Sequence, residues 1–299
     1  MRQKTFNDEM KEMFGGKVYR LCLQTGCTCP NRDGKVSHGG CIFCSEGGSG
    51  EFAAPASLPV SLQIEAAKKL VVKKLSKSFK GYMAYFQSFS NTYGDCGKLT
   101  ELFTETISRD DILALSVATR PDCLPDDIVS MLAALNRIKP VYVELGLQTI
   151  HEKTAVLINR GYSLSVYEDA VRRLKEAGIK VVVHIIAGLP GEDEEMILET
   201  AGYLAGTGPF RIIPDGIKIS ILYVLKNTPL YDMYIKNPEL IHEYAPEEYA
   251  LLIKKILDIL PPQVTVHRLT GDPPKKLLVS PLWTADKKRI LNLIHGLCR

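Results

Sequence analysis

Five of the eight cysteines in this chain lie close together, between residues 22 and 44, and thiol groups at this density can bind a metal. They are Cys22, Cys27, Cys29, Cys41 and Cys44. The tightest pair is Cys41-Ile42-Phe43-Cys44, and Cys29 precedes it with eleven residues between. Because thiolates favour zinc, copper and iron–sulfur clusters, the segment predicts a soft-metal centre.

Two kinds of metal centre fit these cysteines. A structural zinc site needs four tetrahedral ligands, often from two Cys-x-x-Cys pairs. Only one such pair is present, although Cys22, Cys27 or Cys29 could supply the rest. An iron–sulfur cluster held by three cysteines would instead leave one iron open to a carboxylate and an amine. The zinc alternative would make the chain a zinc-stabilised RNA-binding module without catalysis.

The bulk composition is that of an ordinary globular protein. Of 299 residues, 45% are hydrophobic and 24% charged, and the net charge of +3 neither demands nor excludes a nucleic-acid partner. The sequence has no apolar run of membrane-spanning length and no apolar segment at its start, so we predict a cytoplasmic protein without a membrane span. Clustered cysteines in that compartment are more often metal ligands than disulfides. The isolated Cys96, Cys123 and Cys298 are predicted to be ordinary thiols.

Short apolar runs alternate with amphipathic segments along most of the chain. This pattern predicts parallel strands buried on both faces, each followed by a helix. About six such units are too few for a closed eight-stranded barrel. We therefore predict an α/β fold, an open (β/α)6 partial barrel over residues 1–235, with a C-terminal α/β extension over 236–299. The strands are expected at 18–23, 82–86, 112–117, 141–147, 179–186 and 216–222, and the helices at 61–80, 97–109, 125–137, 151–158, 164–178 and 192–204.

The carboxyl ends of these strands are polar or rich in glycine, and ligand sites in parallel α/β folds lie at that edge. The cysteine loop, 22–50, follows the first strand and should lie at the same rim. The polar residues after the second strand can contact a ligand or simply form a turn, and both interpretations stay open. The candidates are Gln87, Ser88 and Asn91 after the second strand, Thr119 and Arg120 after the third, Gln148 after the fourth, and Gly188, Leu189 and Pro190 after the fifth.

Several segments together resemble the radical S-adenosylmethionine (SAM) enzymes, and within them a bacterial YhcC/YtqA-like group. The resemblance covers nearly the whole chain. The spacing Cys-x11-Cys-x2-Cys departs from the commonest one, Cys-x3-Cys-x2-Cys, and is similar to that of the elongator catalytic subunits. The segments are Cys29-Pro30-Asn31-Arg32-Asp33-Gly34, residues 39–44, Thr119-Arg120-Pro121-Asp122, Asn159-Arg160-Gly161, residues 184–191 and residues 268–274.

The resemblance implies a 4Fe–4S cluster on Cys29, Cys41 and Cys44, with SAM at the fourth iron and cleaved to a 5′-deoxyadenosyl radical. It also implies that Phe43, before the last cysteine, lies beside the cofactors. The Gly-Gly-Glu segment with which many relatives hold the SAM amino group is absent, so Gln87 or nearby backbone must replace it. Thr119, Arg120, Gln148 and the turn at 188–190 are further expected SAM contacts. Cys27 is interpreted as a bystander, with a role as ligand or redox partner as the alternative.

Glu144 and His184 are the predicted catalytic residues. A carboxylate within an apolar strand is costly unless it is paired, so Glu144 is expected to point into the barrel towards SAM or substrate. The alternative is a salt bridge from Glu144 to Arg120 or Lys180, and for His184 a hydrogen-bonded position in the core. Lys218, on the sixth strand, can face the lumen or reach outward.

The resemblance implies an enzyme that modifies the wobble uridine of tRNA, converting a 5-carboxymethylaminomethyl group towards 5-aminomethyl. A flavodoxin- or ferredoxin-type reductant and a downstream methyltransferase are the other expected partners. The alternative reaction is an elongator-like addition of a carbon unit, although no acetyltransferase-like domain is recognised in the sequence. Basic residues of the tail, including Arg268, Lys275 and Lys287, are candidate RNA contacts, whereas the lysines at 68–80 are interpreted as solvated surface.

Overall fold

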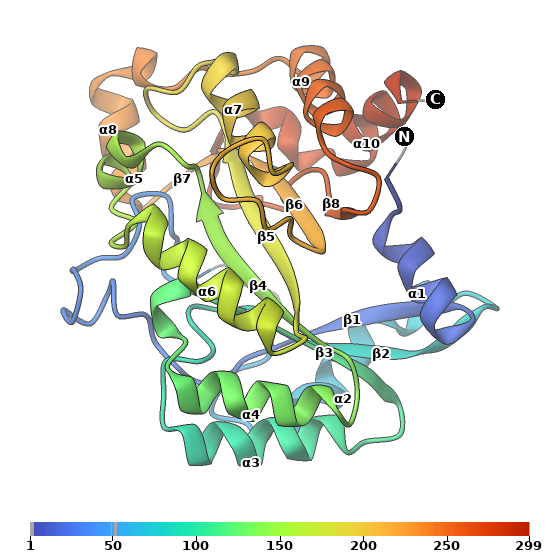
Figure 1. Cartoon of the computed structure of the whole chain (residues 1–299). Coiled ribbons are helices and arrows are strands. Elements are labelled where there is room, and N and C mark those ends of the chain that lie inside the picture. The colour runs from blue at the N-terminus through green and yellow to red at the C-terminus, as the bar shows by residue number, and fades with distance from the viewer. Residues whose placement is uncertain (1–2, 49, 51–52, 299) are drawn as a thin grey trace.

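A curved, wholly parallel sheet forms the centre of the computed structural model, which describes residues 3–48, 50 and 53–298 (Figure 1). Residue 49 of the predicted cysteine loop lies outside the described residues. The sheet order, β1-β2-β3-β4-β5-β6-β8, follows the chain, so each strand lies beside its predecessor in the sheet. The strands are β1 (Lys17–Leu23), β2 (Phe79–Phe86), β3 (Ile112–Thr119), β4 (Val141–Gln148), β5 (Lys180–Ala187), β6 (Gly216–Ile221) and β8 (Thr265–Arg268).

The six predicted strands are confirmed as a partial barrel, and the structure adds a seventh. β8 pairs with the edge of β6, placing Thr265 opposite Gly216. This strand was not predicted, because it is four residues long and lies in the segment expected to be an extension. The strands before and after β8 in the chain, β7 (Val224–Leu225) and β9 (Leu278–Ser280), form a separate antiparallel pair.

Helices cover the outer face of the sheet, and the main apolar core lies between the two layers (Figure 1). Aspartates begin several of these helices: Asp95 and Asp193 each accept a hydrogen bond from a backbone amide of the first turn, which satisfies an otherwise unpaired donor. No helix in the described part of the chain is long and apolar enough to cross a membrane. The helices are α1 (Phe6–Phe14), α2 (Val60–Val71), α3 (Cys96–Ile107), α4 (Asp126–Asn136), α5 (Glu152–Leu157), α6 (Leu164–Glu176), α7 (Glu194–Leu204), α8 (Pro229–Lys236), α9 (Pro246–Ile259) and α10 (Lys287–Leu297).

The helix predicted over 61–80 was too long. α2 ends at Val71, a single 3-10 turn covers Val72–Lys74, and Phe79 already belongs to β2. Phe79 pairs with Lys17 of β1, so the parallel sheet extends strand structure into a segment that the lysine-rich pattern had assigned to the helix. Tertiary pairing overrides local helix preference here.

Helix α1 closes the barrel at the end opposite the cysteine loop. Phe6 and Met10 pack against Met83, Tyr142 and other inward-facing side chains of the strands. Glu9 adds an ion pair to Lys180 and accepts a hydrogen bond from the Tyr142 hydroxyl at 3.0 Å. The lumen therefore opens at the carboxyl ends of the strands, where the sequence predicted the site.

Candidate active site

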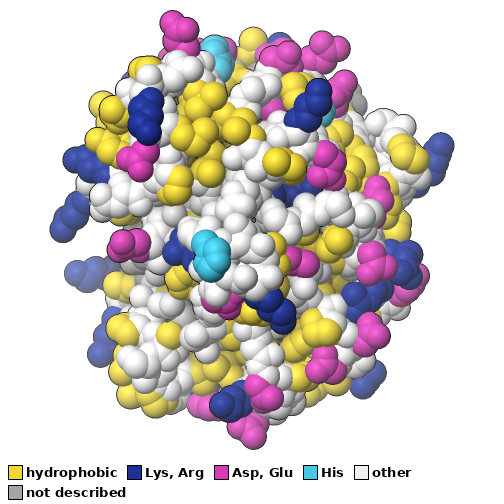
Figure 2. All heavy atoms as spheres, turned by 90° about the vertical axis from the view of Figure 1, so that its left-hand side faces the viewer, with side chains coloured by type: hydrophobic (Ala, Val, Ile, Leu, Met, Phe, Trp, Pro, Cys, Tyr) yellow, Lys and Arg dark blue, Asp and Glu magenta, His cyan; other side chains and the backbone are white. Residues whose placement is uncertain are grey.

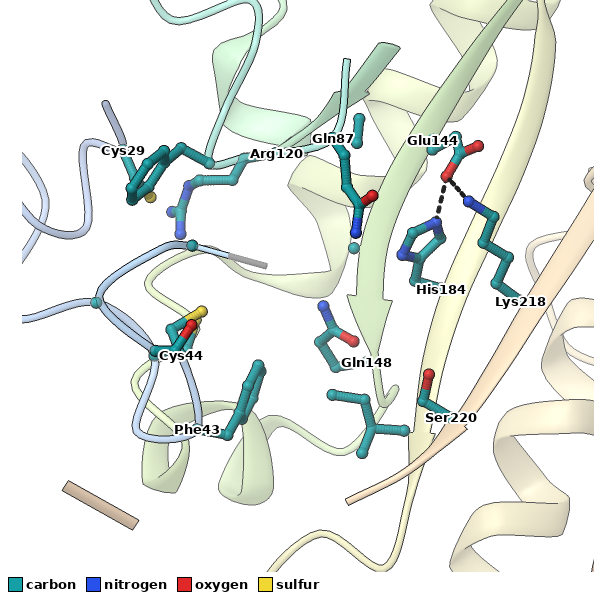
Figure 3. Close-up of a pocket in the computed structure, with 18 of the residues that line it drawn as sticks. Cys29, Phe43, Cys44, Gln87, Arg120, Glu144, Gln148, His184, Lys218 and Ser220 are labelled. Carbon is teal, nitrogen blue, oxygen red and sulfur yellow. Dashed lines mark hydrogen bonds and ion pairs between the residues drawn. The ribbon is translucent and has the colours of Figure 1, made fainter. Parts of the chain in front are cut away.

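A cavity of about 420 Å³ lies within the curve of the sheet and receives side chains from all seven of its strands. Figure 3 shows Cys29, Cys44 and Phe43 on one side and Glu144, His184 and Lys218 on the other, with Gln87 and Gln148 between them. This arrangement leaves room for a ligand that extends from the cysteines to a polar trio formed by Glu144, His184 and Lys218.

Cys29, Cys41 and Cys44 all line the cavity, as the sequence predicted. A hydrogen bond with Cys44, together with burial, holds the pKa of the Cys41 thiol well above its usual range. Among the described residues, no three His, Cys, Asp or Glu side chains are grouped tightly enough to hold a single metal ion. The three thiols that face one cavity fit an iron–sulfur cluster held by three cysteines.

The two other cysteines of the segment are placed differently. Cys22 lies on β1 and lines the cavity, where its thiol donates to the Gln87 side-chain oxygen at 3.4 Å. Cys27 is half-buried and packs against the main core. The bystander interpretation of Cys27 stays a prediction.

Hydrogen bonds from polar side chains connect the cysteine loop to the segment between α5 and α6, and that segment to the end of β4. The buried Asn31 amide donates to the Asn159 carbonyl at 2.5 Å and lies 3.7 Å from the Cys41 sulfur. Asn159 in turn donates to the Gly40 carbonyl at 2.8 Å. Arg160, only 1% exposed, donates to the Leu147 and Thr149 carbonyls. Neither Asn31 nor Arg160 had a predicted role, although both lie in the segments that resemble the family.

Gln87, Thr119, Arg120, Gln148 and Phe43 line the cavity, as predicted. Gln148 has a left-handed backbone (φ 67°) at an irregularity in the β4–β5 pairing. Such a strained conformation in a non-glycine residue often marks a functional site, because it re-aims a side chain. Arg120 is held by a two-pronged ion pair with Asp122, at 2.9 and 2.7 Å.

The structure does not bring every predicted cofactor contact to this cavity. The Asn91 amide is buried, donating to the Phe86 and Ala118 carbonyls, and therefore braces the ends of two strands. Ser88 is buried against the backbone of Gly50. The turn Gly188-Leu189-Pro190 is buried too, and its leucine packs in an apolar cluster with Ile42 beneath the cysteine loop. SAM contacts by these residues stay predictions without support from the described cavity wall.

Glu144 points into the lumen, as predicted, and its partners are His184 and Lys218. One carboxylate oxygen lies 2.7 Å from His184 Nε2 and also binds the Lys218 ammonium group, while the other accepts from Ser116 at 2.8 Å. The alternative salt bridges were wrong: Arg120 pairs with Asp122, and Lys180 pairs with Glu9.

Burial gives the members of this trio unusual proton affinities. It lowers the pKa of Lys218 to about 7, an effect that Glu144 opposes and that the nearby Arg20 and Arg268 strengthen. Burial also lowers the pKa of His184 to about 4, so its ring is neutral at physiological pH. Burial acts against ionisation of Glu144, but Lys218 and His184 hold its pKa well below the usual range. Lys218 is thus an amine that can exchange a proton near neutrality.

Several further polar residues of the cavity had no predicted site role, among them Arg20, Tyr85 and Ser220, and Arg268 was expected to contact RNA instead. Tyr85 lies 3.1 Å from the Lys218 nitrogen, and Arg268 donates to Ser220 at 2.8 Å. A charge inside an apolar strand could have revealed Arg20, as it did Glu144. Arg268 had no such signal, because its strand was not recognised.

Two family models match the chain, one described as the Radical SAM superfamily over residues 26–204 and one as the Radical_SAM C-terminal domain over 214–298. The protein YtqA of Bacillus subtilis (strain 168) is 42% identical over 294 residues, which cover 98% of this chain and 88% of YtqA. A tRNA uridine(34) acetyltransferase of Methanocaldococcus jannaschii is 31% identical over 170 residues, 56% of this chain and 30% of that protein. Among solved structures, Elp3 of the archaeon Methanocaldococcus infernus superimposes with a TM-score of 0.68 at 19% identity, over 94% of this chain and 63% of Elp3.

Proposed function

The chain belongs to the radical SAM superfamily, in the YtqA-like and elongator-like part of it, and from this premise we propose that it modifies the wobble uridine of tRNA. As a member it is an enzyme, and its cofactors are a 4Fe–4S cluster and SAM. When bound, these cofactors together supply a 5′-deoxyadenosyl radical. The observation that carries the proposal is the single cavity that joins the three cluster cysteines to a buried, proton-exchanging trio.

The choice of tRNA as substrate rests on sequence similarity. Basic side chains at the mouth of the cavity support it. The relative that shares 31% identity over more than half of this chain is a tRNA uridine(34) acetyltransferase. Lys287 lines the cavity and pairs with the exposed Asp272 at its rim, and Lys275 and Lys276 are exposed in the same tail. Figure 2 shows Lys and Arg side chains on one face with Asp and Glu among them. We therefore expect RNA affinity to come from local contacts at the mouth, with a modest dependence on salt.

The proposed reaction removes the two-carbon unit from a 5-carboxymethylaminomethyl group. The methylene between nitrogen and carboxylate would lose a hydrogen atom. The resulting substrate radical would return one electron to the flavodoxin- or ferredoxin-type protein that supplied the first, which leaves an iminium. Water adds to the iminium carbon, the carbon–nitrogen bond breaks, and the products are glyoxylate and the 5-aminomethyl group. A downstream methyltransferase would act on that amine, and we propose that these steps take place in the cytoplasm.

This chain's residues have distinct parts in the proposal. Cys29, Cys41 and Cys44 hold the cluster, and the amides of Gln87 and Gln148 orient SAM. Lys218 accepts or returns the proton of the substrate nitrogen, with Glu144 fixing its position. Helix α1 closes the lumen below, which shields a substrate radical from bulk solvent on that side.

Nucleoside analysis of tRNA from a strain lacking the gene tests the substrate. We expect 5-carboxymethylaminomethyl uridines to accumulate and 5-aminomethyl forms to disappear. In vitro, deuterium at the carboxymethyl methylene should appear in 5′-deoxyadenosine, and glyoxylate should form in equal amount. An unchanged nucleoside profile together with absent deuterium transfer would exclude this reaction while leaving the cofactor set intact.

The acetyltransferase named above gives one reason to consider a second reaction, the elongator-like addition of a carbon unit from acetyl-CoA. Dependence of product formation on acetyl-CoA would favour it, whereas the removal proposed here needs SAM, water and a carrier that supplies one electron and takes one back. The non-catalytic zinc module is not retained, because the chain is a radical SAM enzyme.

A further inference from the structure

We propose that the end of the cavity away from the cysteines is a subsite for a carboxylate group of the substrate, held by Arg268, Arg20 and Lys218. The inference rests on the proposed function for the identity of the substrate, but its structural basis is independent of it. That basis is two arginines in the lumen without ion pairs in the described part of the chain, each with a buried Nε that has no hydrogen-bond partner there, beside a lysine that already shares the carboxylate of Glu144.

Arg20 and Arg268 come from the two opposite edges of the sheet, β1 and β8, which the curvature brings to the same lumen. A nitrogen of Arg20 lies 2.9 Å from His267 Nδ1, on the strand that carries Arg268. Arg268 donates to Ser220 at 2.8 Å. The Nε atoms of both guanidinium groups are buried and have no hydrogen-bond partner. Neither arginine forms an ion pair with any residue that the structure describes.

The charges at this end do not balance. Glu144 is the carboxylate that faces Arg20, Lys218 and Arg268, and its two oxygens are already bound by Ser116, His184 and Lys218. Asp272, the other acidic residue of the cavity wall, is exposed at the mouth and pairs with Lys287. Glu9, which lies beside His267, is already paired with Lys180. Within the cavity wall, one buried carboxylate therefore stands against three basic side chains, and buried charge without a counter-charge is costly.

A carboxylate is the group that best removes this imbalance. Guanidinium presents planar, paired donors that match the two oxygens of a carboxylate, and charge-assisted hydrogen bonds of this kind are among the strongest in proteins. A carboxylate bound here would place the adjoining methylene and nitrogen beside Lys218, on the path towards the cysteines shown in Figure 3. Two molecules could bring such a group, the substrate and the methionine part of SAM. We assign the subsite to the substrate, because Gln87 and Gln148 separate it from the cysteines.

The test compares two anticodon stem-loop RNAs, one with 5-carboxymethylaminomethyl uridine and one with its neutral methyl ester. Affinities are measured anaerobically on the cluster-loaded protein without turnover. We expect wild type to prefer the carboxylate RNA about tenfold or more, which corresponds to one charge-assisted contact. Arg268→Gln and Arg20→Gln should reduce the preference to less than about threefold. The charge-loss control Lys288→Gln, on the exposed face of α10, should weaken both RNAs equally and keep the preference.

Equal binding of the two RNAs by wild type, or an unchanged preference in Arg268→Gln, would overturn the assignment. So would a loss of SAM affinity in Arg268→Gln with the RNA preference intact, because the arginine would then serve the SAM carboxylate. If the glutamine variants fail to fold or to retain iron, Arg268→Lys and Arg20→Lys keep the charge and should retain a reduced preference. A preserved preference without formation of the aminomethyl product would refute the proposed reaction but leave the subsite standing.

Discussion

Glu144 and Lys218 form an ion pair inside the lumen from strands β4 and β6, which are separated in the sheet by β5. His184, on the intervening strand, binds the same carboxylate oxygen and lies opposite Lys218 in the strand register. The curvature of the sheet allows this contact, because side chains on the inner face of a curved sheet converge. Both His184 and Lys218 depend on this one carboxylate, which makes Glu144 the most informative residue to change.

Replacing Glu144 with glutamine should destabilise the protein by about 3 kcal/mol at pH 6, because it leaves a buried ammonium group without its counter-charge. The cost should shrink at pH 9, where Lys218 can lose its proton. Urea unfolding under anaerobic conditions measures both values. Asp258→Asn, which changes an exposed i,i+4 pair with Lys254, is the matched control and should shift stability by less than about 0.5 kcal/mol. Equal effects of the two substitutions would contradict the buried pair.

The stability of wild type should rise with pH between about 7 and 8.5, and Lys218→Met should lack this rise. The pKa of Lys218 is about 7 in the folded chain and near its ordinary 10.5 when unfolded, so between these values the unfolded chain binds the extra proton. The slope approaches about 1.4 kcal/mol per pH unit. His184 and His267, both with a pKa of about 4, influence only the more acidic range. The groups that surround the Lys218 amine are Arg20, Cys22, Tyr85, Glu144, His184 and Arg268.

Denaturation curves at several pH values, measured in parallel on both proteins, give the comparison. Burial raises the pKa of the Cys22 and Cys27 thiols, which lowers the stability of the folded chain at higher pH. Both proteins share this effect, so the quantity to use is the difference in unfolding free energy between wild type and Lys218→Met at each pH. A difference that does not change from pH 7 to 8.5 would show that Lys218 keeps an ordinary pKa.

Features set by local sequence were predicted well. The alternation of apolar runs and amphipathic segments located the six strands of the predicted barrel, and the spacing of Cys29, Cys41 and Cys44 located the cluster loop at their rim. Glu144 was expected in the lumen because a carboxylate in an apolar strand requires a partner. These inferences need only neighbours in sequence and the general rule for ligand sites in parallel sheets.

Features set by long-range geometry were not predicted. The partners of Glu144 depend on the curvature of the sheet, so Lys218 was not identified as one of them. β8 is too short for its pattern to stand out, and with it Arg268 was lost from the site. Asn91 was expected at the ligand because it is polar and follows a strand, but its amide instead satisfies backbone carbonyls. The position of Asn91 in the sequence predicted that it lies at the end of a strand, but not the direction in which its side chain points.

If Cys29, Cys41 and Cys44 hold the cluster as proposed, alanine at any one of them should remove most of the iron and the brown colour, because each would supply one of three ligands. Cys27→Ala should keep both, because its side chain packs against the core. Iron and sulfide analysis of anaerobically purified protein gives the result. Equal loss of iron in Cys27→Ala would make Cys27 a ligand, and one zinc per chain in wild type would contradict the cluster itself.

Asn31→Ala should loosen the cluster loop without unfolding the barrel. The substitution removes the hydrogen bond to the Asn159 carbonyl and the contact with the Cys41 sulfur. We expect iron to be lost several-fold faster on exposure to air, with thermal stability of the barrel nearly unchanged. Asn292→Ala, on the exposed face of α10, is the control. A rate of iron loss equal to that of wild type would mean that the loop is held by other contacts.

Gly146→Ala should weaken SAM binding through Gln148. An added Cβ would lie 2.7 Å from the Gln148 amide nitrogen, so this side chain must move away. If the amide orients SAM, its displacement should raise the dissociation constant about five- to tenfold, the value of one hydrogen bond. Gln148→Ala should have a similar effect, and the double variant should be no worse than Gln148→Ala alone, since both changes remove one contact. Gly296→Ala, where an added methyl meets nothing within 4 Å, should leave SAM affinity unchanged. Normal SAM affinity in both Gly146→Ala and Gln148→Ala would remove Gln148 from the cofactor site.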